Sequence, residues 1–318
     1  MQDPASLRSA TYTGLFALIE QYAPASPTAS FSSKDLQAIL TGRAAHAGKT
    51  RKFLLRAEQQ NLQHFSTRKP DIVITYTWGM DLRRDLPRFL ERLYWRLKRS
   101  GRVASWEEFA SKTFWVDIFF NDQNSKDIVQ DLNAAQRIYE EAWVHAVLVM
   151  RDPLSRGWCL FELGVRVWAV GKEFGLDHPA VLRLLRAAHG AEEVYTSRSD
   201  WTSHSAAAVA GRLPLFVAVE GVTELQAEVF GYAGADAFGR MATTQAEDKP
   251  EIQKRLSLLL ESPDRFNAVI SALAAREKDY FDGALGGLRP RLYPLLIFCI
   301  CLCLFVVSCF FQSLPVGL

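Results

Sequence analysis

Residues 114–123 read FWVDIFFNDQ, an apolar run that ends in carboxylate and amide side chains. The run is typical of a buried strand followed by a polar loop. Residues 155–163 read SRGWCLFEL, which predicts a loop leading into a helix with one acid, Glu162, among bulky apolar neighbours. An acid in such surroundings costs free energy unless it has a partner or a function. Glu162 is therefore the first candidate for a functional residue.

Apolar strands and helical patterns alternate on both sides of these stretches. Strands are expected at residues 71–77, 113–120, 144–150 and 213–220, with helices at 82–99, 128–142 and 158–172 and two more starting at Leu225 and Glu251. Such alternation predicts βαβ units and a parallel sheet. The strands are apolar nearly throughout, which indicates that helices cover both faces of the sheet.

The predicted α/β domain occupies residues 69–275. A helical prefix is expected at residues 1–65, where LFALIEQYA and KDLQAIL have helical spacing. Residues 174–211 fit the alternation less well and are interpreted as an insertion with one short helix at 180–188. Residues 276–291, which are rich in glycine towards their end, are expected to form a linker.

The C-terminal stretch has the composition of a membrane span. Residues 292–318 contain no charged side chain, and those from 293 to 311 are almost wholly apolar. About 20 residues of helix cross the hydrocarbon core of a bilayer, and a helix in a protein core would normally keep a polar face, which this segment lacks. We therefore predict a single-pass transmembrane helix at residues 292–312.

The charges beside this segment predict its orientation. Arg289 and Arg291 lie just before it, and positive residues favour the cytosolic side of a membrane. The α/β domain is therefore expected in the cytosol, in the manner of a tail-anchored protein. The sequence does not indicate which membrane is used.

The charge and the cysteine content of the chain indicate which kinds of partner and which compartment are expected. The formal charge of the chain is +2, so no broad basic field favours nucleic acid. Cys159 is the one cysteine before the predicted span, and no CxxC pair or disulfide framework is present, which suits a reducing compartment. No spacing of histidine, cysteine and acidic residues suggests a metal site, and no bound cofactor is expected.

Polar and aromatic side chains follow the expected strands. In an open α/β sheet, ligands bind beyond the carboxyl ends of the strands, and the start of the helix after the third strand lies at the same rim. The residues expected to form a site there are Tyr76, Trp78, Gly79, Asp117, Gln123, Trp158 and Glu162.

Four landmarks in this region carry a family resemblance. The first is TYTWG at 75–79, and the second starts with WVD at 115–117 and ends at Gln123. The third is IYEEA at 138–142, and the fourth is RGWCLFE at 156–162. In this order they resemble the fungal heterokaryon-incompatibility (HET) domain. The same region is similar to TIR domains, most clearly in WCLFEL at 158–163, which resembles the WCxxEL helix of plant TIR domains. The resemblance implies a flavodoxin-like (TIR-like) parallel sheet with helices on both faces.

The resemblance also implies an activity. Many TIR domains cleave NAD at the nicotinamide–ribose bond with the glutamate of this helix, and fungal HET members trigger cell death. Carried over, Glu162 would be the catalytic carboxylate, ionised and stabilising a cationic transition state. Tyr76 or Trp78 could stack on a ring of the nucleotide, and residues 121–128 would correspond to a mobile loop that gates the site or contacts a neighbouring protomer.

Three functions remain open at this point, the third being a nucleotide sensor that binds without turnover. One is a membrane-anchored, self-associating NAD glycohydrolase in stress or cell-death signalling, with NAD as its substrate. The alternative is a non-catalytic membrane-bound scaffold of the same fold, in which Glu162 is structural and paired with Arg156 or Arg166. The first-strand loop, which carries Trp78 and Gly79 where plant TIR domains have charged residues, favours the scaffold.

Overall fold

The computed structural model describes residues 9–26, 28–46, 65–66, 68–120, 127–150, 153–187, 203–219 and 236–278. The predicted membrane span at 292–312 lies outside these residues, as do Gln123 and the start of the helix expected from Leu225. In the part of the chain that the structure describes, no helix combines the length and the apolar character needed to cross a membrane.

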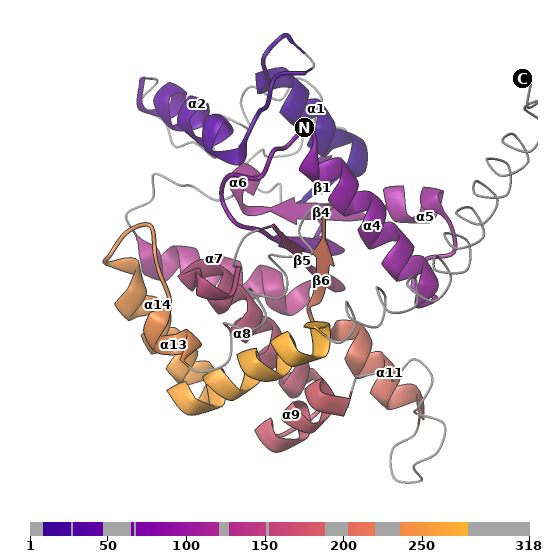
Figure 1. Ribbon diagram of the computed structural model, residues 1–318, viewed down its shortest axis with the longest axis vertical. Helices are drawn as coiled ribbons and strands as arrows, with labels where there is room; N and C mark the ends of the chain where they lie inside the picture. Colours follow the sequence, from indigo (N-terminus) through magenta and orange to yellow (C-terminus); the bar gives the residue numbers. More distant parts are fainter. Residues whose placement is uncertain are drawn as a thin grey trace, which may run out of the picture.

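A six-stranded sheet in the order β2-β1-β4-β3-β5-β6 runs through the centre of the molecule (Figure 1). Its strands are β1 (Ser9–Thr11), β2 (Phe65–Ser66), β3 (Ile72–Thr75), β4 (Thr113–Val116), β5 (Val144–Val149) and β6 (Leu215–Ala218). Strands β4, β3, β5 and β6 are parallel, β1 pairs antiparallel with the edge strand β4, and β2 pairs antiparallel with β1. The expected α/β class with a mostly parallel sheet is confirmed.

Helices cover both faces of this sheet. The ring of Tyr12, from α1 (Tyr12–Tyr22), packs on Phe114, whereas the ring of Tyr139, from α7 (Ile128–Glu141), packs on Trp115. Phe114 and Trp115 are neighbours on β4, so their side chains point to opposite faces. Accordingly, α1 and α4 (Asp85–Arg99) lie on one side of the sheet in Figure 1, and α7 and α8 (Gly157–Glu173) lie on the other.

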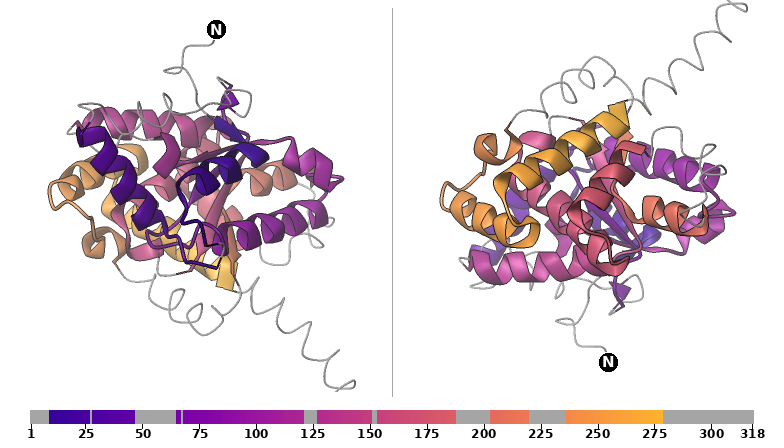
Figure 2. Two further views of the ribbon diagram at one scale, coloured as in Figure 1. Left: turned by 90° about the horizontal axis from the view of Figure 1, so that it is seen from above. Right: turned by 90° about the horizontal axis from the view of Figure 1, so that it is seen from below.

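Further helices complete the two layers. They are α2 (Ser33–His46), α5 (Trp106–Ala110), α6 (Asp117–Phe120), α9 (His178–Ala187), α11 (Ser203–Arg212), α13 (Ala237–Arg240), α14 (Asp248–Leu260) and the short 3₁₀ helix η3 (Pro153–Ser155). Residues 263–278 are also helical. Gly164 lets α14 and this last helix approach α8, because a Cβ there would meet Leu256 and Phe266. Figure 2 shows α14 and the helix at 263–278, in orange to yellow, on the outer side of that layer.

The prefix expected to be helical at residues 1–65 also contributes strands to the sheet. Helices α1 and α2 are present, but Ser9–Thr11 and Phe65–Ser66 extend the sheet as β1 and β2. Ala10 is fully buried and pairs with Phe114 of β4. Strands this short show no periodicity in the sequence, and only pairing with a distant strand defines them. The described part of the prefix therefore belongs to the same sheet as the rest of the domain.

Two other boundaries differ from the prediction. The strand expected at 113–120 ends at Val116, and α6 begins at Asp117, whose carboxylate accepts the N–H of Ile118 at 2.6 Å. A short apolar run fits a strand or a buried helical turn equally well, so the sequence did not separate the two. The expected insertion contributes α9 and α11, and Leu185 and Val209 from these helices join the core.

Candidate functional site

Glu162 lies in the second turn of α8, against the carboxyl end of β3. Its side chain accepts a short hydrogen bond from the hydroxyl of Thr75, the last residue of β3. One turn earlier, the thiol of Cys159 lies 3.5 Å from the carbonyl oxygen of Tyr76. Only 7% of Glu162 is exposed. The start of α8 therefore holds the carboxyl group inside the molecule, at the end of the sheet where α/β proteins bind their ligands.

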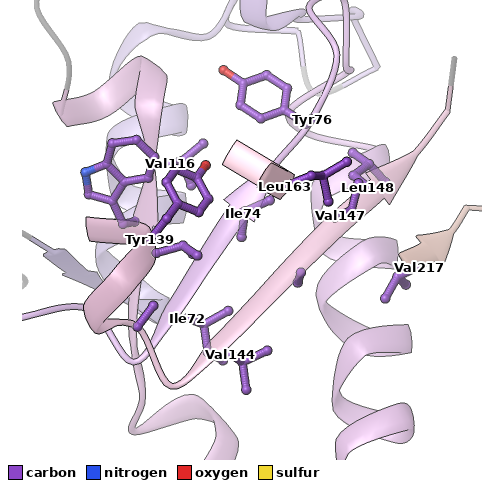
Figure 3. Close-up of a cluster of buried hydrophobic side chains, with 14 of the residues drawn as sticks. Ile72, Ile74, Tyr76, Val116, Tyr139, Val144, Val147, Leu148, Leu163 and Val217 are labelled. Atoms are coloured by element: carbon purple, nitrogen blue, oxygen red, sulfur yellow. The ribbon is translucent and has the colours of Figure 1, made fainter. Parts of the chain in front are cut away.

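The Thr75 hydroxyl joins side chains from three other elements. It lies 2.8 Å from Nε2 of His145 on β5 and 3.2 Å from the hydroxyl of Tyr139 on α7. The rings of Tyr139 and His145 meet edge to face, with centroids 4.8 Å apart. Figure 3 shows Tyr139 beside the strand that carries Ile72 and Ile74. We call Thr75, Tyr139, His145 and Glu162 the buried polar cluster.

The electrostatics of Glu162 differ from the expectation of an ionised carboxylate. Burial and, to a smaller extent, the negative charge of Asp117 raise the pKa of Glu162, hydrogen bonds from Thr75 and Tyr139 lower it, and together these effects bring it to about 8. A carboxyl group with this pKa holds its proton at neutral pH. The Glu162 carboxyl group is therefore protonated in the resting protein, whereas the role that the resemblance implies uses its ionised form.

The neighbouring groups of the cluster are neutral as well. Burial lowers the pKa of His145 well below its usual value, and the charge of Arg166 lowers it further. Burial raises the pKa of the Tyr139 phenol well above its usual value, and the charge of Glu162 adds to this effect. Around neutral pH the cluster therefore consists of uncharged hydrogen-bonding groups.

The ion pair of Glu162 with Arg156 or Arg166, which belonged to the scaffold alternative, is not formed. The guanidinium of Arg166 donates instead to the carbonyl oxygens of Tyr139, Ala142, Trp143 and Arg212, at 2.7 to 3.1 Å. Arg156 donates to the hydroxyl of Thr244 at 2.9 Å. Both arginines are one helical turn or more from the acid along the chain and point to other partners. Within the described residues, no Lys or Arg forms an ion pair with Glu162.

The remaining predicted site residues are only partly brought together. Asp117 follows β4 directly and is close enough to influence the pKa of Glu162. Tyr76 is buried, and Figure 3 shows its ring beyond the strand end, apart from the ring of Tyr139. The indole N–H of Trp158 donates to Asp248 of α14 at 3.1 Å, so this side chain is engaged by α14.

Trp78 and Gly79 lie in the loop after β3. Trp78 is half-buried and packs against the core. Gly79 has φ 105°, a conformation that favours glycine, and its N–H donates to Ser33 at the start of α2 at 3.0 Å. The two residues therefore shape the loop next to the site and tie it to α2.

Thr75, Tyr139 and His145 were not predicted as site residues. Thr75 and His145 are polar residues within otherwise apolar strands, IVIT at 72–75 and VHAVLV at 144–149. A buried polar side chain needs a hydrogen-bond partner, so this pattern could have indicated a polar cluster. The sequence does not show that Tyr139, His145 and Glu162 all meet at the Thr75 hydroxyl, because these contacts join residues far apart in the chain.

A separate hollow of about 520 Å³ lies at the other end of α8. Trp168 and Lys172 of α8, His178 of α9, and Glu261 and Arg265 beyond α14 contribute to its walls. It does not include Glu162.

In the described part of the chain, no group of three or more histidine, cysteine or acidic residues is arranged to hold a metal ion. No protein-family model, curated protein or solved structure matches this chain.

Proposed function

We propose that this protein is a membrane-anchored TIR-like signalling protein that cleaves NAD at the nicotinamide–ribose bond, with Glu162 as the catalytic carboxyl group. The observation that carries the proposal is a buried acid at the carboxyl end of a central parallel strand, hydrogen-bonded to Thr75 and without an ion-pair partner in the described residues. Buried acids of this kind, with a strongly raised pKa, are concentrated at functional sites.

The sheet supports the TIR-like part of the proposal. Along the chain, the parallel strands come in the order β3, β4, β5, β6, and in the sheet they lie as β4-β3-β5-β6. This 2-1-3-4 arrangement is the one found in flavodoxin-like folds, in which ligands bind where the strand order reverses. Glu162 lies at the end of β3, next to that reversal.

The proposed reaction uses the acid in its ionised form. The bond between the ribose carbon and the nicotinamide nitrogen breaks, and its electron pair leaves with the nicotinamide, which becomes neutral. The ribose then carries oxocarbenium-like charge, which the Glu162 carboxylate stabilises. Water adds to the ribose carbon and releases one proton, so the products are nicotinamide and ADP-ribose. Bound NAD brings a positive charge on its nicotinamide ring, which favours ionisation of a nearby carboxyl group.

The proposal places the protein in stress or cell-death signalling at a membrane. Residues 292–312 would anchor it by a single helix, with the α/β domain in the cytosol. Self-association of the domains on the membrane would open or complete the site. No bound cofactor and no nucleic acid are required.

The alternative is a non-catalytic membrane-bound scaffold of the same fold. The observation in its favour is that Glu162 is 7% exposed while the hollow described above lies at the other end of α8. In this function Glu162 would be a protonated member of the polar interior, and self-association would be the whole activity.

Nicotinamide release distinguishes the two functions. The 318-residue chain is reconstituted on liposomes at high surface density, and NAD loss and nicotinamide release are followed by chromatography. Glu162→Gln keeps the shape of the side chain and removes the acid, so we expect release to fall by about 100-fold or more. Glu91→Gln, which changes an exposed glutamate of α4, is the matched control and should be as active as the unmodified protein.

Two outcomes would contradict the proposal. If the unmodified protein leaves NAD intact under crowding, the scaffold function is favoured. If the unmodified protein and Glu162→Gln consume NAD equally, Glu162 is not the catalytic group.

A further inference from the structure

His145 is the least explained member of the buried polar cluster. It is fully buried on β5 between the sheet and α7, and its Nε2 lies 2.8 Å from the Thr75 hydroxyl. Its other ring nitrogen, Nδ1, is buried and has no hydrogen-bond partner among the described residues. A neutral imidazole carries one N–H and one lone pair, so one of them must lie at Nδ1.

The cost of burial decides between the two tautomers. A buried N–H without a partner is rarer and more costly than a buried acceptor without one. The proton of neutral His145 therefore belongs on Nε2, where it can be donated to the Thr75 oxygen.

The tautomer of His145 fixes the direction of the Thr75 proton. A hydroxyl has a single proton to donate, and it cannot be given to a nitrogen that is itself a donor. The proton must therefore point to Tyr139 or to Glu162, and the contact with Glu162 is the shorter of the two. When Glu162 is ionised, donation to its carboxylate is also stronger than donation to a neutral phenol.

We propose that His145 is a positioning residue, which acts through Thr75 so that the Thr75 hydroxyl donates to Glu162 and stabilises its ionised form. The importance of that form for NAD cleavage depends on the proposed function, but the relay from His145 through Thr75 to Glu162 does not. The relay counteracts the effect of burial and leaves Glu162 able to ionise when a cationic substrate arrives.

The groups that face Glu162 define what else could shift its titration. They are Thr75 from β3, Asp117 from α6 and Tyr139 from α7, with His145 behind Thr75. Arg166, one turn further along α8, is bound to main-chain carbonyl groups. Asp117 and Tyr139 are unchanged in the variants below, so their effects cancel in the comparison.

The test is a double-mutant cycle with the titration of Glu162 as the readout. The infrared band of the protonated Glu162 carboxyl group, identified by its loss in Glu162→Gln, is followed against pH in the full chain. His145→Phe keeps a ring against Tyr139 and removes the donor, so the midpoint should rise by about one pH unit. In a Thr75→Val background the same change should leave the midpoint unmoved, because the hydroxyl that carries the effect is absent.

Other results would overturn the relay. No shift on His145→Phe, or an equal shift in both backgrounds, would show that His145 does not act through Thr75. If His145→Phe does not fold, His145→Met takes its place with the same expectation, and His145→Gln, which offers an amide N–H near the position of Nε2, should restore the original midpoint. A shift in the midpoint together with intact NAD would support the relay and reject the proposed function.

Discussion

The free energy of unfolding of the protein is expected to fall as the pH rises, and replacing Glu162 with glutamine should remove this fall. Between about pH 5 and pH 8, the free energy of unfolding of the unmodified protein should fall by about 3 kcal/mol relative to Glu162→Gln. The pKa of Glu162 in the folded protein is about 8, against an ordinary value of 4.5. At a pH between these two pKa values, Glu162 holds a proton in the folded chain and has released it in the unfolded chain.

The sign of this effect follows from proton binding. Because the folded state binds more protons in this window, its stability falls as the pH rises. The stabilising neutral form is fully present below the ordinary pKa and is lost as the pH passes the folded pKa. Glutamine has no proton to release, so its variant lacks this slope.

Urea unfolding at several pH values in detergent measures the effect, and the difference between the two proteins removes the slopes that they share. Glu91→Gln, on the exposed surface of α4, is the control and should follow the unmodified protein. If Glu162→Gln also follows the unmodified protein at every pH, the carboxyl group does not have a raised pKa.

Replacing Arg166 with methionine is expected to destabilise the fold by about 3 kcal/mol. The Arg166 guanidinium donates to the carbonyl groups of Tyr139 and Ala142 at the end of α7, to Trp143 before β5, and to Arg212 at the end of α11. Carbonyl groups at a helix end have no partner within the helix. Arg212 also donates to Ala142 and Trp143, so the carbonyls of Tyr139 and Arg212 lose the partner given by Arg166.

Burial of the guanidinium itself opposes part of this stabilisation. Burial lowers the pKa of Arg166 to about 9, which shows that its charge is poorly solvated. Methionine removes that cost but leaves buried carbonyl groups unsatisfied, and the second effect should be larger. Thermal or urea unfolding measures the loss.

Arg156→Met is the matched control, since Arg156 bonds a hydroxyl at the surface, and its effect should stay below about 0.5 kcal/mol. Equal stability of the two variants would show that Arg166 does not hold α7, β5 and α11 together.

The parallel core of the sheet could be predicted because its strands are apolar nearly throughout. Residues 72–75 and 144–149 are buried throughout, and the spacing of apolar residues placed α8 within one residue at each end. Strands β1 and β2 are only three and two residues long, and their pairing with β4 and with each other is a tertiary contact that has no sequence pattern. The helical turn that begins at Asp117 was missed for another reason, since a short apolar run fits a strand and a buried helical turn equally well.

The sequence predicted which acid lies in the candidate site, but it did not predict the protonation state or the partners of that acid. An acid within an apolar helix pointed to Glu162, and the rule for α/β sheets placed it at the rim with Asp117. Its protonation and its partners depend on burial and on contacts with Thr75 and Tyr139, which the sequence does not give. The candidate partners Arg156 and Arg166 are on the same stretch of chain, but their guanidinium groups meet carbonyl and hydroxyl groups instead.

The rate of nicotinamide release as a function of pH tests most directly whether Glu162 acts on NAD in its ionised form. The rate is measured at low NAD concentration on liposomes, for the unmodified protein and for Glu162→Gln. We expect the rate of the unmodified protein to rise with pH around a midpoint near 8, because ionisation of the free enzyme governs it. We expect Glu162→Gln to show no such rise. A rate that does not depend on pH, or a glutamine variant that releases nicotinamide as fast as the unmodified protein, would contradict this role for Glu162.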